Sequence, residues 1–319
     1  MKNVTKILTA VVLCAALFAS TQRTDALGGN PALWPGDEAN IAAFPAQVNN
    51  HSYLQVNGLG TYDVDGVSTT DAGSVSLVTQ KDGTTWGFNY GGDYADDWMS
   101  MHWGNGDIGV MVGLQSTTGA TTAEDHSDMS VSYGQVFGFG ELGAHLTVLG
   151  ADDADPMLGV NLRRATSAFL FDNMVVSIDD LMADDLAFDV DLFTHMDAGG
   201  ADVVFGWGME YDAAGVGTNM ATMTQTATIG VEANMTDWAT LRLGYNWSHE
   251  LACDNDTDAC GENNGDGEDG YALGLGFNWG GLTADYLISS SLLQDPIGTI
   301  TGYSAGALTD HGITLTYSF

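Results

Sequence analysis

The sequence predicts an all-β fold in which antiparallel, up-and-down strands close into a transmembrane barrel. Three observations lead to this prediction. Short segments alternate apolar with small or polar residues, as in YALGLGFNW at 271–279, and a period of two is typical of strands. Glycine is frequent, with 42 residues, and proline is scarce, with 5. Beyond the N-terminus, no apolar run approaches the roughly 20 residues of a membrane-spanning helix, so a membrane would have to be crossed by strands.

The N-terminal residues have the pattern of a secretory signal peptide. Two lysines precede an apolar stretch at 7–18, which is too short to cross a bilayer as a helix. Small residues permit cleavage after Ala19 or after Ala26. We place it after Ala26, so that 1–26 is the signal peptide, and we expect the rest of the chain to be exported.

The chain is strongly acidic. It has 42 Asp and Glu against 7 Lys and Arg, a formal net charge of −35. Nucleic acids are bound through basic side chains that neutralise phosphates, so we expect no nucleic-acid partner. So much negative charge is tolerated best where salt screens it, and it also attracts cations. A saline habitat and a cation-attracting channel are both compatible with it.

Sixteen segments carry the strand pattern. We expect about 14 strands, within a range of 12–16, because three of the segments are short and such boundaries slip by several residues. The segments are 52–60, 74–80, 84–90, 96–103, 107–115, 129–139, 141–149, 156–164, 169–178, 185–193, 202–211, 222–232, 238–249, 270–279, 282–290 and 311–319. They place the barrel at 51–319.

The connections between these segments alternate in length. Counting back from the last strand, 81–83, 104–106 and 280–281 are short, whereas polar stretches such as 250–269 are long. Outer-membrane barrels have short periplasmic turns and longer external loops, so the C-terminus is expected at the periplasmic end. The connection at 194–201 is relatively long for the short side.

The chain ends in HGITLTYSF at 311–319, where Ile313, Leu315, Tyr317 and Phe319 share one face. This aromatic end after alternating apolar positions resembles the C-terminal signal that bacterial outer-membrane barrels present to their assembly machinery. The usual glycine of that signal lies closer to the end than the one here. The resemblance implies the outer membrane of a diderm bacterium, with its lipid, lipopolysaccharide and barrel-assembly machinery as partners.

The stretch before the first strand, LGGNPALWPGDEANIAAFPAQV at 27–48, resembles the N-terminal signature of fatty-acid transporter-like barrels. Those proteins usually carry Asn-Pro-Ala where this chain has Phe44-Pro45-Ala46. In that family the segment lies within the barrel and can plug it, so the resemblance implies such a plug at 27–50. An ordered periplasmic lead-in is the other interpretation.

Charged residues on several predicted strands lie opposite the apolar face. Asp189, Asp191, Glu210 and Asp285 have this register, and Arg242 is the inward basic residue that the pattern places best. Rings of acidic side chains favour cations in a pore. We therefore predict that these five residues line the lumen and that cations are preferred.

Two cysteines remain after the predicted signal peptide is removed. Cys253 and Cys260 are expected to form a disulfide, because exported proteins reach an oxidising compartment. The loop that they would close is short, so its effect on stability is expected to be small.

The same stretch is rich in carboxylates. Asp254, Asp256, Asp258 and Glu262 offer the oxygen ligands that Ca²⁺ prefers. Their spacing departs from the EF-hand pattern at two positions, and a solvated acidic loop would read the same way. A bound Ca²⁺ at an external loop is therefore one expectation, and no cofactor is the other.

Together these patterns predict a passive, porin-like channel for small solutes and ions in the outer membrane. Uptake of hydrophobic molecules, as in the fatty-acid transporter-like barrels, is one alternative, and a closed structural or adhesive barrel is another. Seven histidines are present, but no local spacing groups one with a nucleophile or with carboxylates as a hydrolase needs. We therefore expect no enzymatic activity.

Overall fold

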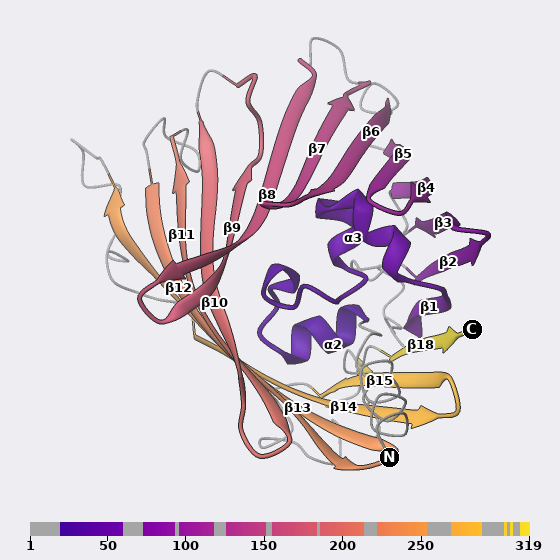
Figure 1. Cartoon of the computed structure of the whole chain (residues 1–319), viewed down its shortest axis with the longest axis vertical. Coiled ribbons are helices and arrows are strands. Elements are labelled where there is room, and N and C mark those ends of the chain that lie inside the picture. The colour runs from indigo at the N-terminus through magenta and orange to yellow at the C-terminus, as the bar shows by residue number, and fades with distance from the viewer. Residues whose placement is uncertain are drawn as a thin grey trace.

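The computed structural model describes a barrel with its N-terminal segment inside (Figure 1). The described residues are 20–59, 73–92, 96–117, 126–150, 155–183, 186–213, 222–253, 269–288, 303–304, 307–308 and 313–319. Within them, no helix is long and apolar enough to span a membrane.

The described barrel strands form one closed antiparallel sheet of sixteen, in which each strand pairs with its neighbours along the chain. Their bounds are β1 Tyr53–Leu59, β2 Gly73–Lys81, β3 Thr84–Gly92, β4 Asp96–Asn105, β5 Ile108–Thr117, β6 His126–Phe137, β7 Gly140–Val148, β8 Met157–Ala168, β9 Phe171–Ile178, β10 Ala187–Asp197, β11 Ala201–Asp212, β12 Thr222–Thr236, β13 Ala239–Cys253, β14 Asp269–Trp279, β15 Leu282–Ile288 and β18 Ile313–Ser318. The ring closes where β1 pairs with β18. Two short strands, β16 Tyr303–Ser304 and β17 Ala307–Leu308, form a separate hairpin.

This topology confirms the predicted fold class. Sixteen strands are the upper end of the expected range, and each predicted segment corresponds to one of them. The three short segments become β2, β3 and β4, with nine or ten residues each. Glycines at the end of β3 and aspartates at the start of β4 interrupt the apolar alternation there, which is why the sequence pattern shortens these strands.

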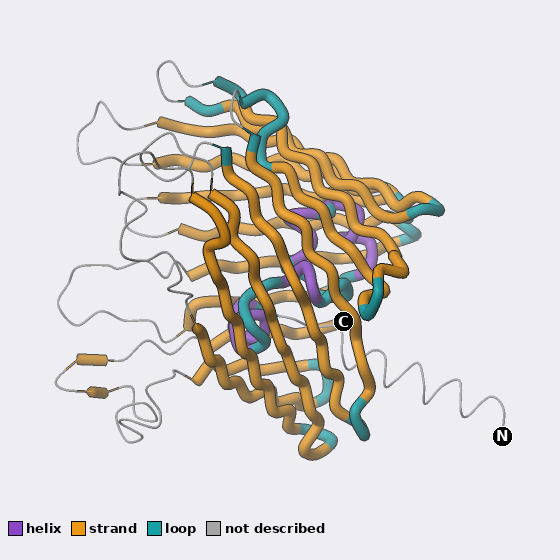
Figure 2. The backbone as a smooth tube through the Cα atoms, turned by 90° about the vertical axis from the view of Figure 1, so that its left-hand side faces the viewer, coloured by secondary structure: helices purple, strands orange, loops and turns teal. Residues whose placement is uncertain are grey.

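Short turns join the strands at the end of the barrel that carries the C-terminus (Figure 2). The β14–β15 turn consists of Gly280 and Gly281, whose φ values of +58° and +100° suit the two-residue turns that follow strand twist. The connection predicted at 194–201 is also short, because β10 continues to Asp197 and β11 begins at Ala201. The apparent exception on the short side is therefore absent.

The outer face of the wall is apolar. Val112, Leu114, Met101 and Tyr271 are 43%, 49%, 59% and 70% exposed, although such side chains would be buried in a water-soluble protein. The C-terminal strand also has apolar side chains on its outer face, because Tyr317 and the final Phe319 are exposed and their rings are in contact. An apolar exterior on a sheet without edges is what a lipid bilayer requires.

If the apolar outer face contacts lipid, a charged side chain placed on it in the middle of a strand should destabilise the barrel. We expect Val112→Arg, in the middle of β5, to lower the free energy of unfolding in vesicles by about 2–4 kcal/mol, because an arginine there is placed in the hydrocarbon core. Asp107→Arg, in the exposed turn before β5, is the matched control and should change it by less than about 1 kcal/mol. Urea unfolding followed by tryptophan fluorescence measures both, and equal effects would contradict the assignment.

Candidate functional site

The candidate site is the barrel interior together with the N-terminal segment at 20–50, called the plug below. The plug consists of α2 Thr21–Ala26, η1 Pro31–Leu33, α3 Asn40–Ala43 and η2 Pro45–Asn50, and Figure 1 shows these elements surrounded by the wall. The helix α2 packs against β13, β14 and β15, whereas η2 packs against β3 to β6 on the other side. The plug thus spans the cross-section of the barrel.

Glycines on the inner face of the wall make room for the plug backbone. A Cβ added to Gly109 or Gly134 would collide with the backbone at Pro45, and one added to Gly143 would collide with the carbonyl oxygen of Ala43. The small inward residues that alternate with the apolar face therefore have a packing role. They allow the main chain of the plug to lie directly on the wall.

A chain of ion pairs joins the plug to the wall. The Arg23 guanidinium lies 3.0 Å from Asp37 Oδ2 and 2.7 Å from Glu232 Oε2. Arg242 lies 3.0 Å from that same Glu232 oxygen and 2.6 Å from Asp285 Oδ1. Arg23, Arg242 and Asp285 are at most 5% exposed. Buried charges of this kind are tolerated only when they are paired, so each member depends on the others.

The hydrogen bonds of Ser20 extend this network to the start of the plug. Its hydroxyl donates to Asp285 Oδ2 over 3.0 Å and accepts from the backbone N–H of Arg23, which caps α2. Burial alone would lower the pKa of Arg23, but the carboxylates of Glu232 and Asp37 raise it above its ordinary value. Arg23 therefore remains charged and acts as a cationic anchor.

A second anchor lies on β7 and β8. Arg163 Nη2 donates to Glu141 Oε2 over 2.6 Å, and the amide of Gln47 donates to the same oxygen over 2.6 Å. Arg163 also donates to Asn40 Oδ1 and lies 4.4 Å from the centre of the Phe44 ring. One wall arginine thus contacts both α3 and the residue that precedes η2.

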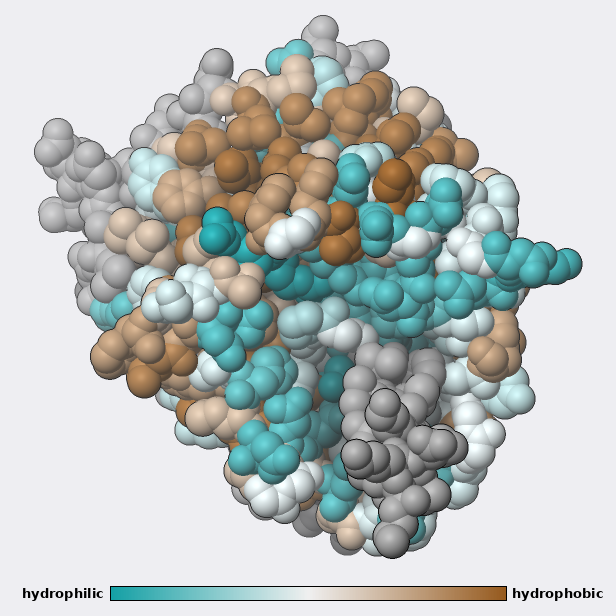
Figure 3. Space-filling view, in the orientation of Figure 1, coloured by the Kyte–Doolittle hydropathy of each residue, from teal (hydrophilic) through white to brown (hydrophobic). Residues whose placement is uncertain are grey.

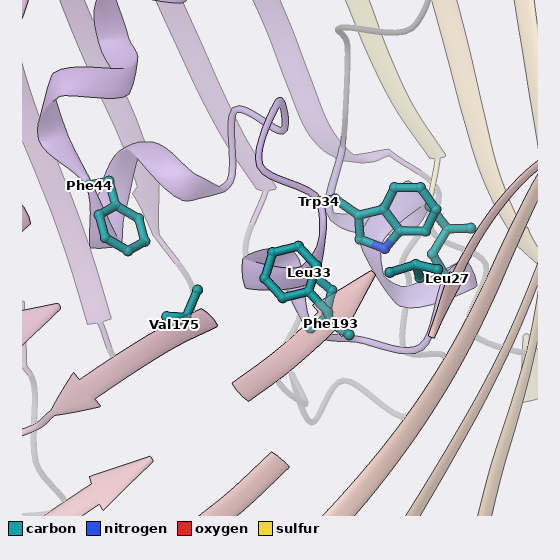
Figure 4. Packing of buried hydrophobic residues seen from close by; sticks show 7 residues of the cluster. Leu27, Leu33, Trp34, Phe44, Val175 and Phe193 are labelled. Atoms are coloured by element: carbon teal, nitrogen blue, oxygen red, sulfur yellow. The ribbon is translucent and has the colours of Figure 1, made fainter. Parts of the chain in front are cut away.

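An apolar cluster fills the interior between these anchors (Figure 4). Its side chains are 0–4% exposed. The plug contributes Leu27, Leu33, Trp34 and Phe44, and the wall contributes Val175, Phe193 and Val204. His195 borders the cluster and its Nε2 lies 2.7 Å from the carbonyl oxygen of Leu33. The plug and the wall therefore pack together in a shared apolar cluster.

The five predicted lumen residues all have the inward register, but they fall into two groups. Arg242 and Asp285 pair with each other in the buried network. Asp189 lies directly across from Glu210 in the β10–β11 register, and Asp191 accepts a hydrogen bond of 3.0 Å from the plug residue Asn30. No ion pair joins this acidic trio to a basic side chain in the described part of the chain. A role in ion selectivity stays a prediction for the trio.

The sequence pattern does not identify the residues that hold the plug. Arg23 lies within the predicted signal peptide, and no local motif distinguishes Glu232, Glu141 or Arg163. One clue concerns Arg163, which lies on the strand face opposite Leu162. An arginine on an inner face needs a carboxylate partner, and Glu141 has the inward register on the neighbouring strand.

The predicted disulfide and calcium site lie beyond what is described. Cys260, Asp254, Asp256, Asp258 and Glu262 are outside the described residues, and the side chain of Cys253 is not described. Elsewhere, among the described residues, no group of three or more His, Cys, Asp or Glu side chains is placed to hold a metal ion. Both predictions stay predictions.

Arg23 also predicts where the exported chain is cut. Cleavage after Ala26 would remove Arg23 and leave its two carboxylate partners without that charge, whereas cleavage after Ala19 would keep it. These contacts favour cleavage after Ala19 over the cleavage after Ala26 expected from the sequence, because buried carboxylates are destabilising when unpaired, and we therefore expect the mature protein to begin at Ser20. Intact-mass spectrometry of the protein from outer membranes measures this, and a mass that begins at residue 27 would contradict it.

The outer face of the wall is apolar, and in Figure 3 hydrophobic residues cover much of the upper part of the molecule while hydrophilic residues lie across the middle. A closed antiparallel barrel with this distribution is the architecture of bacterial outer-membrane proteins. This chain is an outer-membrane β-barrel.

No protein-family model matches the chain, and no curated protein matches it in sequence. Among solved structures, CdiB from Acinetobacter baumannii is similar with a TM-score of 0.45 and 9% identity over 84% of this chain and 59% of that chain. BamA from Haemophilus ducreyi lacking POTRA domains 1–3 has a TM-score of 0.42 and 10% identity, and the match covers 84% of this chain and 70% of that chain. OmpT of Vibrio cholerae has a TM-score of 0.39 and 13% identity, and the match covers 84% of this chain and 95% of that chain. The match thus spans about three fifths of the CdiB chain.

Proposed function

We propose that this outer-membrane barrel is a channel for small solutes, which the plug keeps closed at rest and which prefers cations when the plug moves. The observation that carries the proposal is the plug itself, which lies inside the barrel and is attached to the wall by side chains on both sides of the interior. An open diffusion pore would need a free path where these side chains meet.

The packing of the plug supports a closed resting state. On the β9–β11 side the shared apolar cluster is 0–4% exposed. On the opposite side, a second cluster consists of Ile41, Val48, Tyr53 and Val78, which are also 0–4% exposed. Side chains this well packed exclude water and ions. Conduction therefore requires that the plug, or part of it, changes position.

The topology supports a plug that can move without loss of the barrel. All sixteen barrel strands pair with one another, and no part of the plug adds a strand to that sheet. The plug is continuous with the wall at β1, and its other contacts are side-chain hydrogen bonds, ion pairs and apolar packing. A neutral hydrogen bond contributes about 0.5–1.5 kcal/mol net and one to a charged group about 1.5–3 kcal/mol, since water replaces it on release.

The charge of the interior supports a preference for cations. The acidic trio of Asp189, Asp191 and Glu210 is not neutralised by a described basic side chain, whereas the described interior arginines are engaged in the plug contacts. Negative charge in a narrow, low-dielectric passage concentrates cations. The net charge of −35 acts in the same direction.

The anchor Arg23 gives the test. We expect Arg23→Gln to raise the open probability in planar bilayers about tenfold or more, because an unpaired buried carboxylate destabilises the closed plug. Arg164→Gln is the matched control, since Arg164 is exposed and, among the described residues, its Nε donates to the neighbouring carbonyl oxygen of Ala165. Both variants must show heat-modifiable migration on gels. A folded Arg23→Gln protein that stays as closed as the control would favour a structural barrel over a channel.

A further inference from the structure

A cavity of about 650 Å³ lies between the plug and the wall formed by β1 to β7. Its floor includes Ile41, Tyr53 and Val78 from the second apolar cluster. From there it extends toward Trp98, near the start of β4, and so away from the end with the short turns. The volume is typical of sites for small organic ligands.

Uncharged hydrogen-bonding groups cover the middle of the cavity. They are the amides and hydroxyls of Gln55, Ser76, Asn89, Ser100 and Ser130, which lie on β1, β2, β3, β4 and β6. Groups of this kind both donate and accept. A ligand held here must therefore present several donors and acceptors around its edge.

Two of the polar atoms in this wall have no partner among the described residues. His102 is 3% exposed, and its Nε2 lies 3.0 Å from Asn89 Nδ2 and 2.9 Å from Ser100 Oγ. Its Nδ1 and the Asn89 Oδ1 are buried without a hydrogen bond. Unpaired buried polar atoms are unfavourable, but these two have almost no accessible surface and lie behind the cavity lining, so the groups that a ligand can reach are the amides and hydroxyls named above.

The charges and aromatic rings of the lining further limit the chemical class of the ligand. No described lining residue is Lys or Arg, whereas Glu38 and Asp128 are acidic, so an anion has no counter-charge. Glu38 already accepts a hydrogen bond from the Gln55 amide, and Asp128 accepts one from the Gly150 N–H, so both acidic groups are already engaged within the protein. Tyr53 at the floor and Trp98 at the far end offer flat apolar faces of the kind that pack against C–H groups.

We propose that this cavity binds a small uncharged polyhydroxylated solute, such as a sugar or a sugar alcohol. Such a molecule combines hydroxyls at its edge with apolar C–H faces, which matches the polar wall and the aromatic ends. The proposal deepens the proposed channel function by naming a solute class, and it rests on that function only for what happens after binding. The site itself is present while the plug closes the barrel.

The test is calorimetric titration of the full-length barrel in detergent with glucose, maltose, sucrose and sorbitol, and with glucose 6-phosphate as the anionic comparator. At least one neutral compound should bind, and glucose 6-phosphate should bind about tenfold more weakly than glucose or not at all. Asn89→Leu and Trp98→Ala should each weaken binding about tenfold or more. Asn173→Leu, on β9 and outside the cavity lining, is the matched control and should bind like the wild type.

Two outcomes would overturn the proposal. One is that no neutral compound in the panel binds, which would mean that the cavity holds water only. The other is that both folded variants bind as tightly as the control. The bilayer conductance of Arg23→Gln is measured without sugar, so it tests the channel proposal separately. A channel that opens but binds no compound of the panel would contradict the proposed solute class and still support the proposed function.

Discussion

Deleting residues 20–50, with the export signal retained, is expected to convert a closed barrel into an open channel. The deletion removes the side chains that the plug contributes to the two apolar clusters. It also removes the plug partners of Arg163 and Glu232. The barrel sheet itself is unaffected in its pairing, because none of its ladders includes the plug. We expect the conductance per inserted protein to rise about tenfold or more in planar bilayers, since the free path is no longer filled.

Adding the plug back separately makes this test specific. A synthetic peptide of residues 20–50 should reduce the conductance of the deleted barrel, because the wall still carries the acceptors for Arg23 and Gln47. A scrambled peptide of the same composition is the control for its charge. If the deleted barrel inserts, is heat-modifiable and stays closed, the plug is not the element that closes the path.

The second large effect expected is on ion selectivity. In the opened barrel, reversal potentials across a KCl gradient should favour K⁺ over Cl⁻, and the triple change Asp189→Asn, Asp191→Asn and Glu210→Gln should reduce this preference severalfold. The physical reason is that these three carboxylates face the interior without a described basic partner, and their field is focused by the low-dielectric wall. The difference between the two proteins should fade at 1 M salt, where the Debye length is only about 3 Å.

A matched triple change separates local charge from net charge. Asp82→Asn, Asp107→Asn and Asp172→Asn also remove three charges, but these residues are exposed, at turns or next to a turn near the short-turn end of the barrel. We expect them to leave the K⁺ preference nearly unchanged. Anion selectivity of the opened wild-type barrel, or equal effects of the two triple changes, would show that the acidic trio does not control permeation.

The fold can be predicted from the sequence because the pattern that indicates a strand involves residues only a few positions apart. In 271–279 the period of two alone indicates which residues face lipid and which face inward, and β14 has that register. The turn at Gly280 and Gly281 was likewise readable, since its residues are adjacent. The expected number of 14 strands fell short of sixteen where glycine and aspartate at strand ends weaken the alternation, as in β3 and β4.

The interior was accessible only in part. Inward registers for Asp191, Arg242 and Asp285 followed from alternation, and all three lie inside. Their partners did not follow, because Arg23 and Glu232 are 209 residues apart and Ser20 and Asp285 are 265 apart. A local pattern places a side chain on a face, but it does not show which distant element meets that face.

By itself, the sequence therefore determined the strands, the apolar exterior, the short-turn end and the small inner face. The tertiary structure alone decided that the plug fills the interior, that Arg242 and Asp285 serve its attachment, and that a polar cavity remains beside it. The reason is physical. Alternation and turn chemistry act between residues a few positions apart, whereas a buried ion pair or a shared apolar cluster forms only once the closed barrel brings distant segments within contact.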